Sequence, residues 1–255
     1  MRKIAFVNEK GGSCKTTLTV SVGAYLALYK GARVLLCDLD PQGQVAKSLG
    51  IDPRGLPLSM TDLLNDPTVK LRDVVHHSRI EGLDVVPSNK TLTDFSIEAA
   101  KRQDRNMRLK VQIDRVRGYD YVLFDSPPSL GLLTMNIMMA TREIVIPVNL
   151  TFLALDGCAE IVDTMEAVRS NYNRRELRVS LVVPTLYRPT RLANAILEKL
   201  GEYFGDRLSP NVIGFNVAID EAQSQGLTIW EYSRSSRGAQ MLAALAEEIA
   251  AIKAD

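Results

Sequence analysis

The sequence is poor in the residues that hold disulfides, metal clusters and cofactors. Its 255 residues include three cysteines, two histidines and one tryptophan. Cys14, Cys37 and Cys158 are odd in number and widely spaced, which argues against a disulfide framework and indicates a reducing compartment. Without a Cys-x-x-Cys pair or a Cys/His cluster, a structural zinc site is not expected. The adjacent His76 and His77 are expected on a surface segment.

The sequence also lacks an excess of one charge and any long apolar run. The 31 Lys and Arg residues are balanced by 30 Asp and Glu, which gives a formal net charge of +1. This balance counts against a strongly basic DNA-coating protein. No stretch approaches the ~18 apolar residues that a membrane-spanning helix needs. The first apolar run ends at Glu9 and Lys10, too early for a signal peptide. We therefore expect a cytoplasmic protein.

What is present is a regular alternation of short apolar runs and helical patterns. Apolar residues make up 46% and charged residues 24%, typical of a globular protein. Strands are expected at 4–8, 33–38, 83–87, 121–125, 143–148 and 178–183. Helices are expected at 16–30, 93–117, 130–140, 156–170, 190–204 and 236–253, with loops and short helices at 51–74. The pattern predicts an α/β fold with a doubly wound, mostly parallel sheet flanked by helices. We expect one domain over residues 1–255, with no separate N-terminal DNA-binding domain.

The strongest local signal is the segment Lys-Gly-Gly-Ser-Cys-Lys-Thr-Thr at residues 10–17, between the first expected strand and helix. Two glycines allow the backbone to curl so that its N–H groups face an anion, and the helix N-terminus adds positive charge. Lys15 then reaches the β- and γ-phosphates of a nucleotide, and the Thr16 hydroxyl binds Mg²⁺. The residues expected to contact the nucleotide are Gly11, Gly12, Ser13, Cys14, Lys15, Thr16 and Thr17.

Carboxylates follow two of the expected strands. Asp38 and Asp40 stand in Asp-Leu-Asp-Pro-Gln-Gly, and Asp125 ends the run Tyr-Val-Leu-Phe-Asp. The carboxyl ends of parallel strands open onto the ligand crevice, so these side chains are expected near one Mg²⁺–phosphate centre. Taken alone, the first motif is equally consistent with an ordinary turn, since Asp, Pro and Gly all favour turns. Beside the phosphate loop, we interpret both motifs as functional.

Together these motifs resemble one family. The ordinary P-loop has glycine where this chain has Glu9 and Cys14, but residues 10–17 match the deviant form KGGxxK[ST][ST]. With the Asp-x-Asp-Pro-Gln motif at 38–42 and Pro-Pro-Ser-Leu-Gly at 127–131, the chain resembles the ParA/MinD group of P-loop ATPases. Within that group it is most similar to the ParA/Soj partition ATPases. Matches such as Phe-Leu-Ala-Leu-Asp-Gly at 152–157 extend the resemblance over nearly the whole length.

The resemblance implies ATP and Mg²⁺ as ligands and gives roles to single residues. Lys10 is the signature lysine, which reaches across a nucleotide-sandwich dimer to the partner's phosphates, and with Lys15 and Asp40 it forms the expected catalytic set. Asp40 orients the attacking water. Thr16, Asp38 and Asp125 lie at the metal, with Asp38 near its water shell. Asn216 lies near the adenine base.

Cys14 leaves two interpretations open. The family usually has glycine there, so the cysteine is either a tolerated substitution or a thiol whose pKa is lowered by the helix N-terminus, which would make it a redox handle.

The resemblance also implies partners: a homodimer in the ATP state, non-specific double-stranded DNA and a ParB-type centromere-binding protein. We expect a nucleoid-associated protein of a bacterial or archaeal cell, with no membrane partner. Residues 169–255 carry 11 basic against 10 acidic residues, so DNA contact requires a local cluster. The expected DNA contacts are Arg188, Arg191, Lys199, Arg207, Arg234 and Arg237. A second basic run at 101–117 is interpreted as an exposed helix that could also lie near DNA.

Four alternatives remain beside this interpretation. The sequence does not distinguish an ATPase that segregates plasmid or chromosome DNA from a ParA-like ATPase that positions a non-DNA cargo. A membrane-cycling MinD-like ATPase is disfavoured, because Glu247, Glu248 and Asp255 outnumber Lys253 at the C-terminal end, where a basic amphipathic helix is needed. A nitrogenase-type iron protein is disfavoured by the absence of cysteines between Cys37 and Cys158. An ATP-dependent metabolic ligase on the same fold is disfavoured by the whole-chain match.

Overall fold

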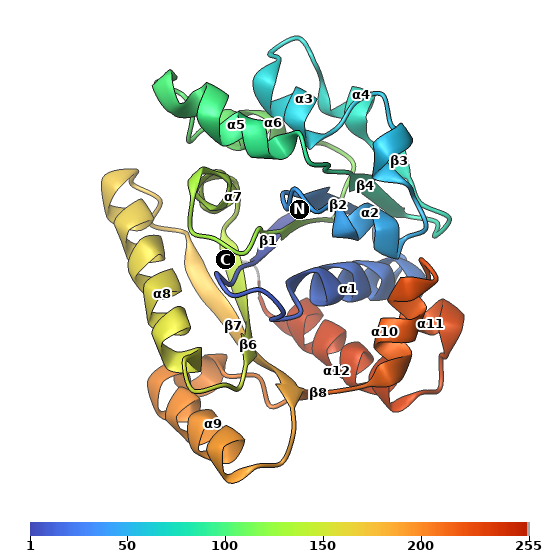
Figure 1. Ribbon diagram of the computed structural model, residues 1–255, viewed down its shortest axis with the longest axis vertical. Coiled ribbons are helices and arrows are strands. Elements are labelled where there is room, and N and C mark those ends of the chain that lie inside the picture. The colour runs from blue at the N-terminus through green and yellow to red at the C-terminus, as the bar shows by residue number, and fades with distance from the viewer. Residues whose placement is uncertain (254–255) are drawn as a thin grey trace.

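The computed structural model describes residues 1–253 and contains a sheet of eight strands in the order β3-β4-β2-β5-β1-β6-β7-β8 (Figure 1). All neighbours pair in parallel except β3 and β4, which are antiparallel. The strands are β1 Arg2–Phe6, β2 Val34–Asp38, β3 His76–His77, β4 Leu83–Val86, β5 Tyr121–Asp125, β6 Glu143–Asn149, β7 Arg178–Tyr187 and β8 Ile213–Gly214. The predicted doubly wound, mostly parallel sheet is confirmed.

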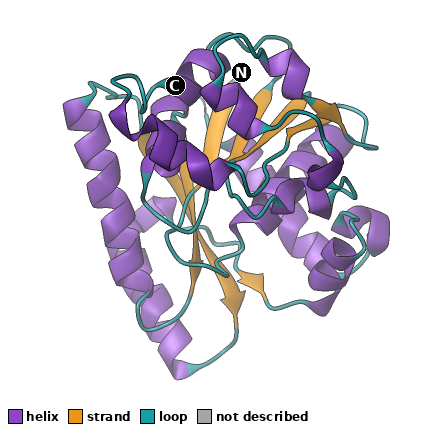
Figure 2. Cartoon of the chain, turned by 45° about the horizontal axis from the view of Figure 1, so that its top comes forward, coloured by secondary structure: helices purple, strands orange, loops and turns teal. Residues whose placement is uncertain are grey.

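Helices cover both faces of the sheet, as Figure 2 shows. One core packs α1 Lys15–Lys30, α2 Gln44–Ser48, α10 Val217–Ser224, α11 Ile229–Tyr232 and α12 Arg237–Ala251 against one face. The other core packs α3 Met60–Asn65, α4 Leu71–Val74, α5 Leu92–Glu98, α6 Arg108–Ile113, α7 Leu132–Ala140, α8 Ala154–Asn171 and α9 Arg191–Phe204 against the opposite face. Three 3-10 turns complete the elements: η1 Pro53–Gly55, η2 Ala99–Lys101 and η3 Gly205–Arg207.

Strand alternation divides the apolar side chains between these two cores. Ile4 and Phe6 of β1 face the α1 and α12 side, while Ala5 faces the α7 and α8 side. Both faces are buried, which explains why the central strands read as continuous apolar runs. Chain order reverses across β1, because β5 and β2 lie on one side of it and β6 and β7 on the other. Such a switch point leaves a crevice at the carboxyl ends of the strands.

The helix predicted over residues 93–117 is wrong, because the chain breaks into α5, η2 and α6. Between them, the carbonyl of Arg105 accepts a hydrogen bond from Asn136 Nδ2, 2.8 Å away, on α7. Arg108 at the start of α6 donates to the carbonyls of Leu64 and Asn65 at the end of α3. These contacts satisfy polar groups in neighbouring helices that a continuous helix would leave unpaired, so tertiary bonding overrides the helical pattern.

The other predicted elements are confirmed with shifts of a few residues at their ends. Two strands were not predicted, β3 and β8, because each has two residues and carries no periodic signal. His76 and His77 form β3 at the edge of the sheet. Within residues 1–253, no helix combines the length and apolar character needed to cross a membrane.

Candidate nucleotide-binding site

The loop at residues 7–14 joins β1 to α1 at the carboxyl end of the sheet. Asn8 holds its first turn: Oδ1 accepts from the Lys10 N–H at 2.9 Å, and Nδ2 donates to the Pro147 carbonyl at 2.6 Å. Ser13 Oγ donates to the Lys10 carbonyl at 3.1 Å. Gly12 has φ of 71°, in the left-handed region that glycine adopts without steric strain. The curled loop that the sequence predicts is therefore present and fixed by its own hydrogen bonds.

Lys15 begins α1 and lies under this loop. Its side chain is buried, with the residue 6% exposed, and Nζ donates to the Lys10 carbonyl at 3.1 Å. Burial lowers the pKa of Lys15, although the nearby carboxylates of Asp125 and Asp40 oppose that shift. A desolvated ammonium with one neutral partner is suited to receive phosphate oxygens.

Two carboxylates lie side by side because of strand register. β2 and β5 pair so that Asp38 is opposite Asp125, and both residues are fully buried. Asp38 accepts from the main-chain N–H of Asp40 at 3.0 Å and of Val45 at 3.1 Å. Asp125 Oδ2 accepts from Thr16 Oγ1 at 2.6 Å. The other oxygen, Oδ1, is buried and has no hydrogen-bond partner among residues 1–253.

These carboxyls are poised to take a cation. Burial raises the pKa of Asp125 to about 7, and burial together with the neighbouring Asp125 raises the pKa of Asp38 well above its usual value. The unpaired Asp125 oxygen and the Thr16 hydroxyl are hard oxygen donors of the kind that Mg²⁺ prefers. No group of three or more His, Cys, Asp or Glu side chains in the described chain could bind a metal alone. The residues fit Mg²⁺ held jointly with phosphate oxygens and water, its usual coordination in nucleotide sites.

Asp40 lies two residues beyond β2, where the chain leaves the sheet. It is partly exposed, and Oδ1 accepts from the Gln42 N–H at 2.9 Å. Its main-chain N–H is bound to Asp38, so the outer carboxylate is held by the inner one. This placement suits a side chain that must contact water at the mouth of the site, and the water-orienting role stays a prediction.

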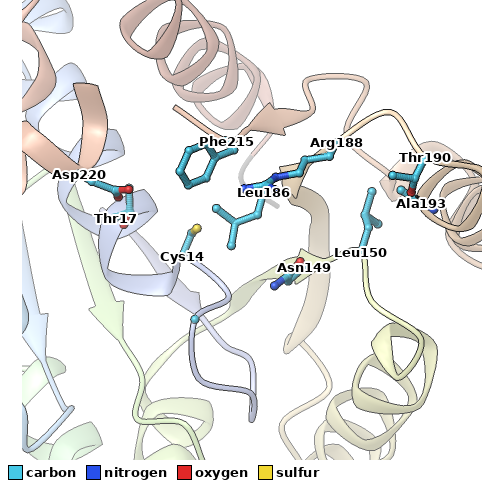
Figure 3. Close-up of a pocket in the computed structure, with 11 residues that line it drawn as sticks. Cys14, Thr17, Asn149, Leu150, Leu186, Arg188, Thr190, Ala193, Phe215 and Asp220 are labelled. Carbon is cyan, nitrogen blue, oxygen red and sulfur yellow. Dashed lines mark hydrogen bonds between the residues drawn. The ribbon is translucent and has the colours of Figure 1, made fainter. Parts of the chain in front are cut away.

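A cavity of about 650 Å³ opens beside the phosphate loop, between α1 and the ends of β6, β7 and β8 (Figure 3). Gly12, Cys14 and Thr17 line it from the phosphate loop and α1, and Leu186 and Phe215 line it from β7 and from the residue after β8. Its volume falls in the range of small-molecule sites, and the apolar walls next to the phosphate loop suit a base and ribose.

The lining of this cavity includes residues that the sequence did not single out. Phe215 is 47% exposed, and the guanidinium carbon of Arg188 lies 4.9 Å from the centre of its ring. Asp220 lines the cavity from α10. Asn216, predicted near the base, caps α10 by accepting from the Ala218 N–H at 3.1 Å, and it is the preceding Phe215 that lines the cavity. The sequence signal that could have identified Phe215 is an aromatic residue directly before Asn216.

Lys10 is engaged within its own chain. Its Nζ donates to the carbonyl of Leu153, in the turn before α8. A β-carbon at Gly157 would lie 3.5 Å from the same Nζ, so the lysine lies along the first turn of α8. In this single chain the signature lysine is thus held at the edge of the loop, and its role across a dimer stays a prediction.

Cys14 combines an unfavourable backbone with an unreactive thiol. Its φ of 67° and ψ of 23° lie in the left-handed region, which costs a non-glycine residue about 1–2 kcal/mol. Burial raises the pKa of the Cys14 thiol to about 11. The interpretation of a redox handle with a lowered pKa is therefore wrong, because desolvation outweighs the helix N-terminus. Leu186, on the opposite wall, is also left-handed, with φ of 52°.

The six predicted DNA contacts do not gather in one place. Arg191 and Lys199 lie exposed on α9, and Arg207 follows in η3. Arg188 lies at the nucleotide cavity. Arg234 stacks on Tyr29 at the end of α1, with 5.2 Å between its guanidinium carbon and the ring centre, and Arg237 begins α12.

Comparisons with known proteins agree with this geometry. The family model described as an AAA domain matches residues 1–179. The sporulation initiation inhibitor protein Soj of Bacillus subtilis is 38% identical over 97% of this chain and 98% of its own. The chromosome partitioning protein ParA of Caulobacter vibrioides is 36% identical over 98% and 94% of the two chains.

A solved structure extends the comparison to bound ligands. Cobyrinic acid a,c-diamide synthase from Mycobacterium smegmatis, with a bound ATP analogue and magnesium, superimposes with a TM-score of 0.85 at 31% identity. The match covers 98% of this chain and 94% of that one. The phosphate loop and the paired carboxylates agree with the 38% and 36% identity to Soj and ParA over nearly the whole chain. The chain therefore belongs to the ParA/Soj family of P-loop ATPases.

Proposed function

We propose that this protein is a dimerising switch ATPase that binds non-specific double-stranded DNA in its ATP state and segregates chromosome or plasmid DNA with a ParB-type partner. The observation that carries the proposal is the register-matched pair Asp38 and Asp125 beside the Thr16 hydroxyl, at the mouth of a preformed phosphate loop. The relatives named for chromosome partitioning support the choice among ATPase functions.

The phosphate end of the site supplies the hydrolytic step. Lys15 and the loop N–H groups bind the phosphates, and Thr16 with Asp125 would hold Mg²⁺, which withdraws charge from the phosphate oxygens. Asp40 orients a water whose oxygen attacks the γ-phosphorus while the bond to the ADP oxygen breaks. The products are ADP and inorganic phosphate. Turnover is slow and partner-stimulated, because the reaction resets a switch.

Lys10 links nucleotide state to dimerisation in this proposal. Two ATP molecules facing each other bring several negative charges together, and a lysine supplied by each chain to the partner's phosphates offsets the repulsion. The hydrogen bond from Lys10 to the Leu153 carbonyl has to break first. Dimerisation therefore trades a bond to a neutral carbonyl for one to a charged phosphate.

DNA binding fits a dimer better than a single chain. A net charge of +1 gives the monomer little attraction for a polyanion. Three of the predicted contacts follow one another along α9 and η3: Arg191, Lys199 and Arg207. Two copies of this strip double the number of phosphate contacts, and the salt dependence of binding rises with that number. Binding then follows the nucleotide state, and the protein associates with the nucleoid only when it is loaded.

The test is retention of duplex DNA at several salt concentrations with ATP, ADP or no nucleotide. We expect retention with ATP alone and a steep salt slope, which the pair Arg191→Glu and Lys199→Glu makes shallower by about four contacts, two in each chain of the dimer. The pair Lys90→Glu and Arg175→Glu, at residues outside both basic regions, changes net charge equally and serves as the control. No retention in any state contradicts the proposal.

A second candidate, an ATP-dependent amide-forming ligase, is favoured by the 31% identity to the diamide synthase. The higher identity to Soj and ParA over the full length favours partitioning. ATP turnover that requires a carboxylic acid substrate and ignores DNA would support the ligase. A ParA-type ATPase with a non-DNA cargo would still retain DNA, so the cargo is identified by the partner that stimulates hydrolysis.

A further inference from the structure

A second cavity, of about 550 Å³, lies far from the phosphate loop. It is open to solvent and is lined by α4, β3 and the segment that runs from α6 into β5. Tyr119 lines it two residues before β5 begins, so the cavity opens near the amino ends of the strands. The nucleotide site lies at the carboxyl ends, which makes the two sites separate. Figure 1 shows α4 and β3 together at the edge of the sheet.

The rim of this cavity is basic. Lys70, Arg72, Arg115 and Arg117 are exposed and line it with His77, and no acidic residue belongs to the lining. Arg72 approaches Asp73 at 3.6 Å, and Arg117 donates to main-chain carbonyls. The side chains of Lys70 and Arg115 make no hydrogen bond or ion pair with any residue in 1–253. Their charge is therefore available to an anion.

The floor is apolar apart from one amide. Val116 is 3% exposed, and Leu71 and Val75 are partly buried beside it. Gln112 is 8% exposed, and its side chain has no hydrogen-bond partner elsewhere in the described chain. A side-chain amide offers two donors and an acceptor, and the amide of Gln112 is not among the buried polar groups without partners, so it is open to solvent in the cavity. The floor therefore presents unused hydrogen-bonding capacity to whatever enters.

Tyr119 adds a fixed aromatic surface. Its hydroxyl donates to Asp84 Oδ2 at 2.6 Å, and His77 Nδ1 lies 2.7 Å from the other oxygen of the same carboxylate. The guanidinium carbon of Arg33 lies 5.9 Å from the ring centre. These contacts hold the ring in place at the cavity wall. A held aromatic ring suits stacking with a flat group such as a nucleobase.

We propose that this cavity binds a nucleoside phosphate, with the base beside Tyr119 and Gln112 and the phosphates on Lys70 and Arg115. Each part of the ligand matches one part of the cavity: stacking surface, amide hydrogen bonds and free cations. The volume falls within the usual range of about 300–1,000 Å³ for small-molecule sites. Duplex DNA fits less well, because its phosphates would reach the rim and leave Gln112 and Val116 uncovered.

Equilibrium dialysis of the Lys15→Ala chain tests the proposal with a defined probe set, the four ribonucleoside diphosphates and pyrophosphate. The substitution weakens binding at the phosphate loop, so remaining binding reports the second cavity. We expect at least one nucleoside diphosphate to bind one per chain, and at least ten times more tightly than pyrophosphate. Adding Lys70→Glu with Arg115→Glu weakens it at least tenfold, and adding Gln112→Leu weakens it severalfold.

Adding Lys101→Glu with Arg175→Glu matches the change in net charge and leaves the affinity unchanged. Thermal unfolding of each variant confirms that it is folded. Three results overturn the proposal: no nucleoside diphosphate bound at millimolar concentration, binding that survives Lys70→Glu with Arg115→Glu, or pyrophosphate bound as tightly as the nucleotides. Competition by duplex DNA with equal loss in the control pair would instead indicate a general cationic surface and also overturn it.

Discussion

The two ends of the nucleotide site are built differently. At the phosphate end, Lys15, Asp38 and Asp125 are buried and held by strand register and short hydrogen bonds. At the base end, Phe215 is about half exposed and is contacted by Arg188, which is also exposed. The phosphate end is therefore preorganised, as a site that stabilises developing charge has to be. The base end can contribute affinity only through packing at the surface.

The largest effect is expected at the preorganised end. Lys15→Ala removes the buried ammonium under the loop, and we expect ATP affinity to fall at least 100-fold, about 3 kcal/mol. Lys10→Ala is the matched control, because Lys10 bonds to Leu153 in the single chain and its loss leaves monomer binding within about threefold. Isothermal titration of ATP measures both. Equal losses in the two variants would contradict the distinction between the lysines.

Asp40→Ala separates chemistry from binding at the same end. We expect the hydrolysis rate to fall about 100-fold while ATP affinity changes little, since water orientation contributes to the transition state alone. The dimer then accumulates with ATP, which size-exclusion chromatography detects. Asp52→Ala, at an exposed turn after α2, serves as the control. Normal turnover in the Asp40 variant would remove this residue from the mechanism.

The base end should respond more weakly. Phe215→Ala is expected to lower ATP affinity about five- to tenfold through lost stacking. Inorganic triphosphate, which has no base, should bind the variant and the parent chain equally well. Val217→Ala, at a similarly exposed position, is the control. A loss that is equal for ATP and triphosphate would show that Phe215 acts on the loop and not on the base.

The smallest effect concerns Cys14, which lies between the two ends. Alanine retains the left-handed strain and glycine relieves it. The free energy of unfolding of the Cys14→Gly variant should therefore be about 1 kcal/mol higher than that of Cys14→Ala. Urea unfolding measures the difference. With a thiol pKa of about 11, Cys14 alkylation by iodoacetamide should be slow at pH 8 and rise as the pH approaches that value. Fast labelling at pH 8 would contradict the burial argument.

The preorganised end was predictable from the sequence because its residues are ordered by the sheet. Asp38 and Asp125 end buried strands, and parallel strands bring their carboxyl ends to one edge, so the motif already contains the geometry. Phe215 was not predictable in this way, since it follows a two-residue strand. The break between α5 and α6 depends on Asn136 and Arg108 reaching distant carbonyls, and no local pattern encodes such partners.

The pairing of β2 with β5 determines where the two acidic groups of the site lie relative to each other. Asp38 stands opposite Asp125 because main-chain hydrogen bonds fix the alignment of the two strands. A slip of one strand by one residue would turn its carboxylate to the other face of the sheet, away from the carboxylate of its neighbour. The spacing of the acidic groups is thus set by the buried centre of the sheet. A change in the loops around the site therefore leaves the distance between the two carboxylates unaltered, because neither residue depends on a loop for its alignment.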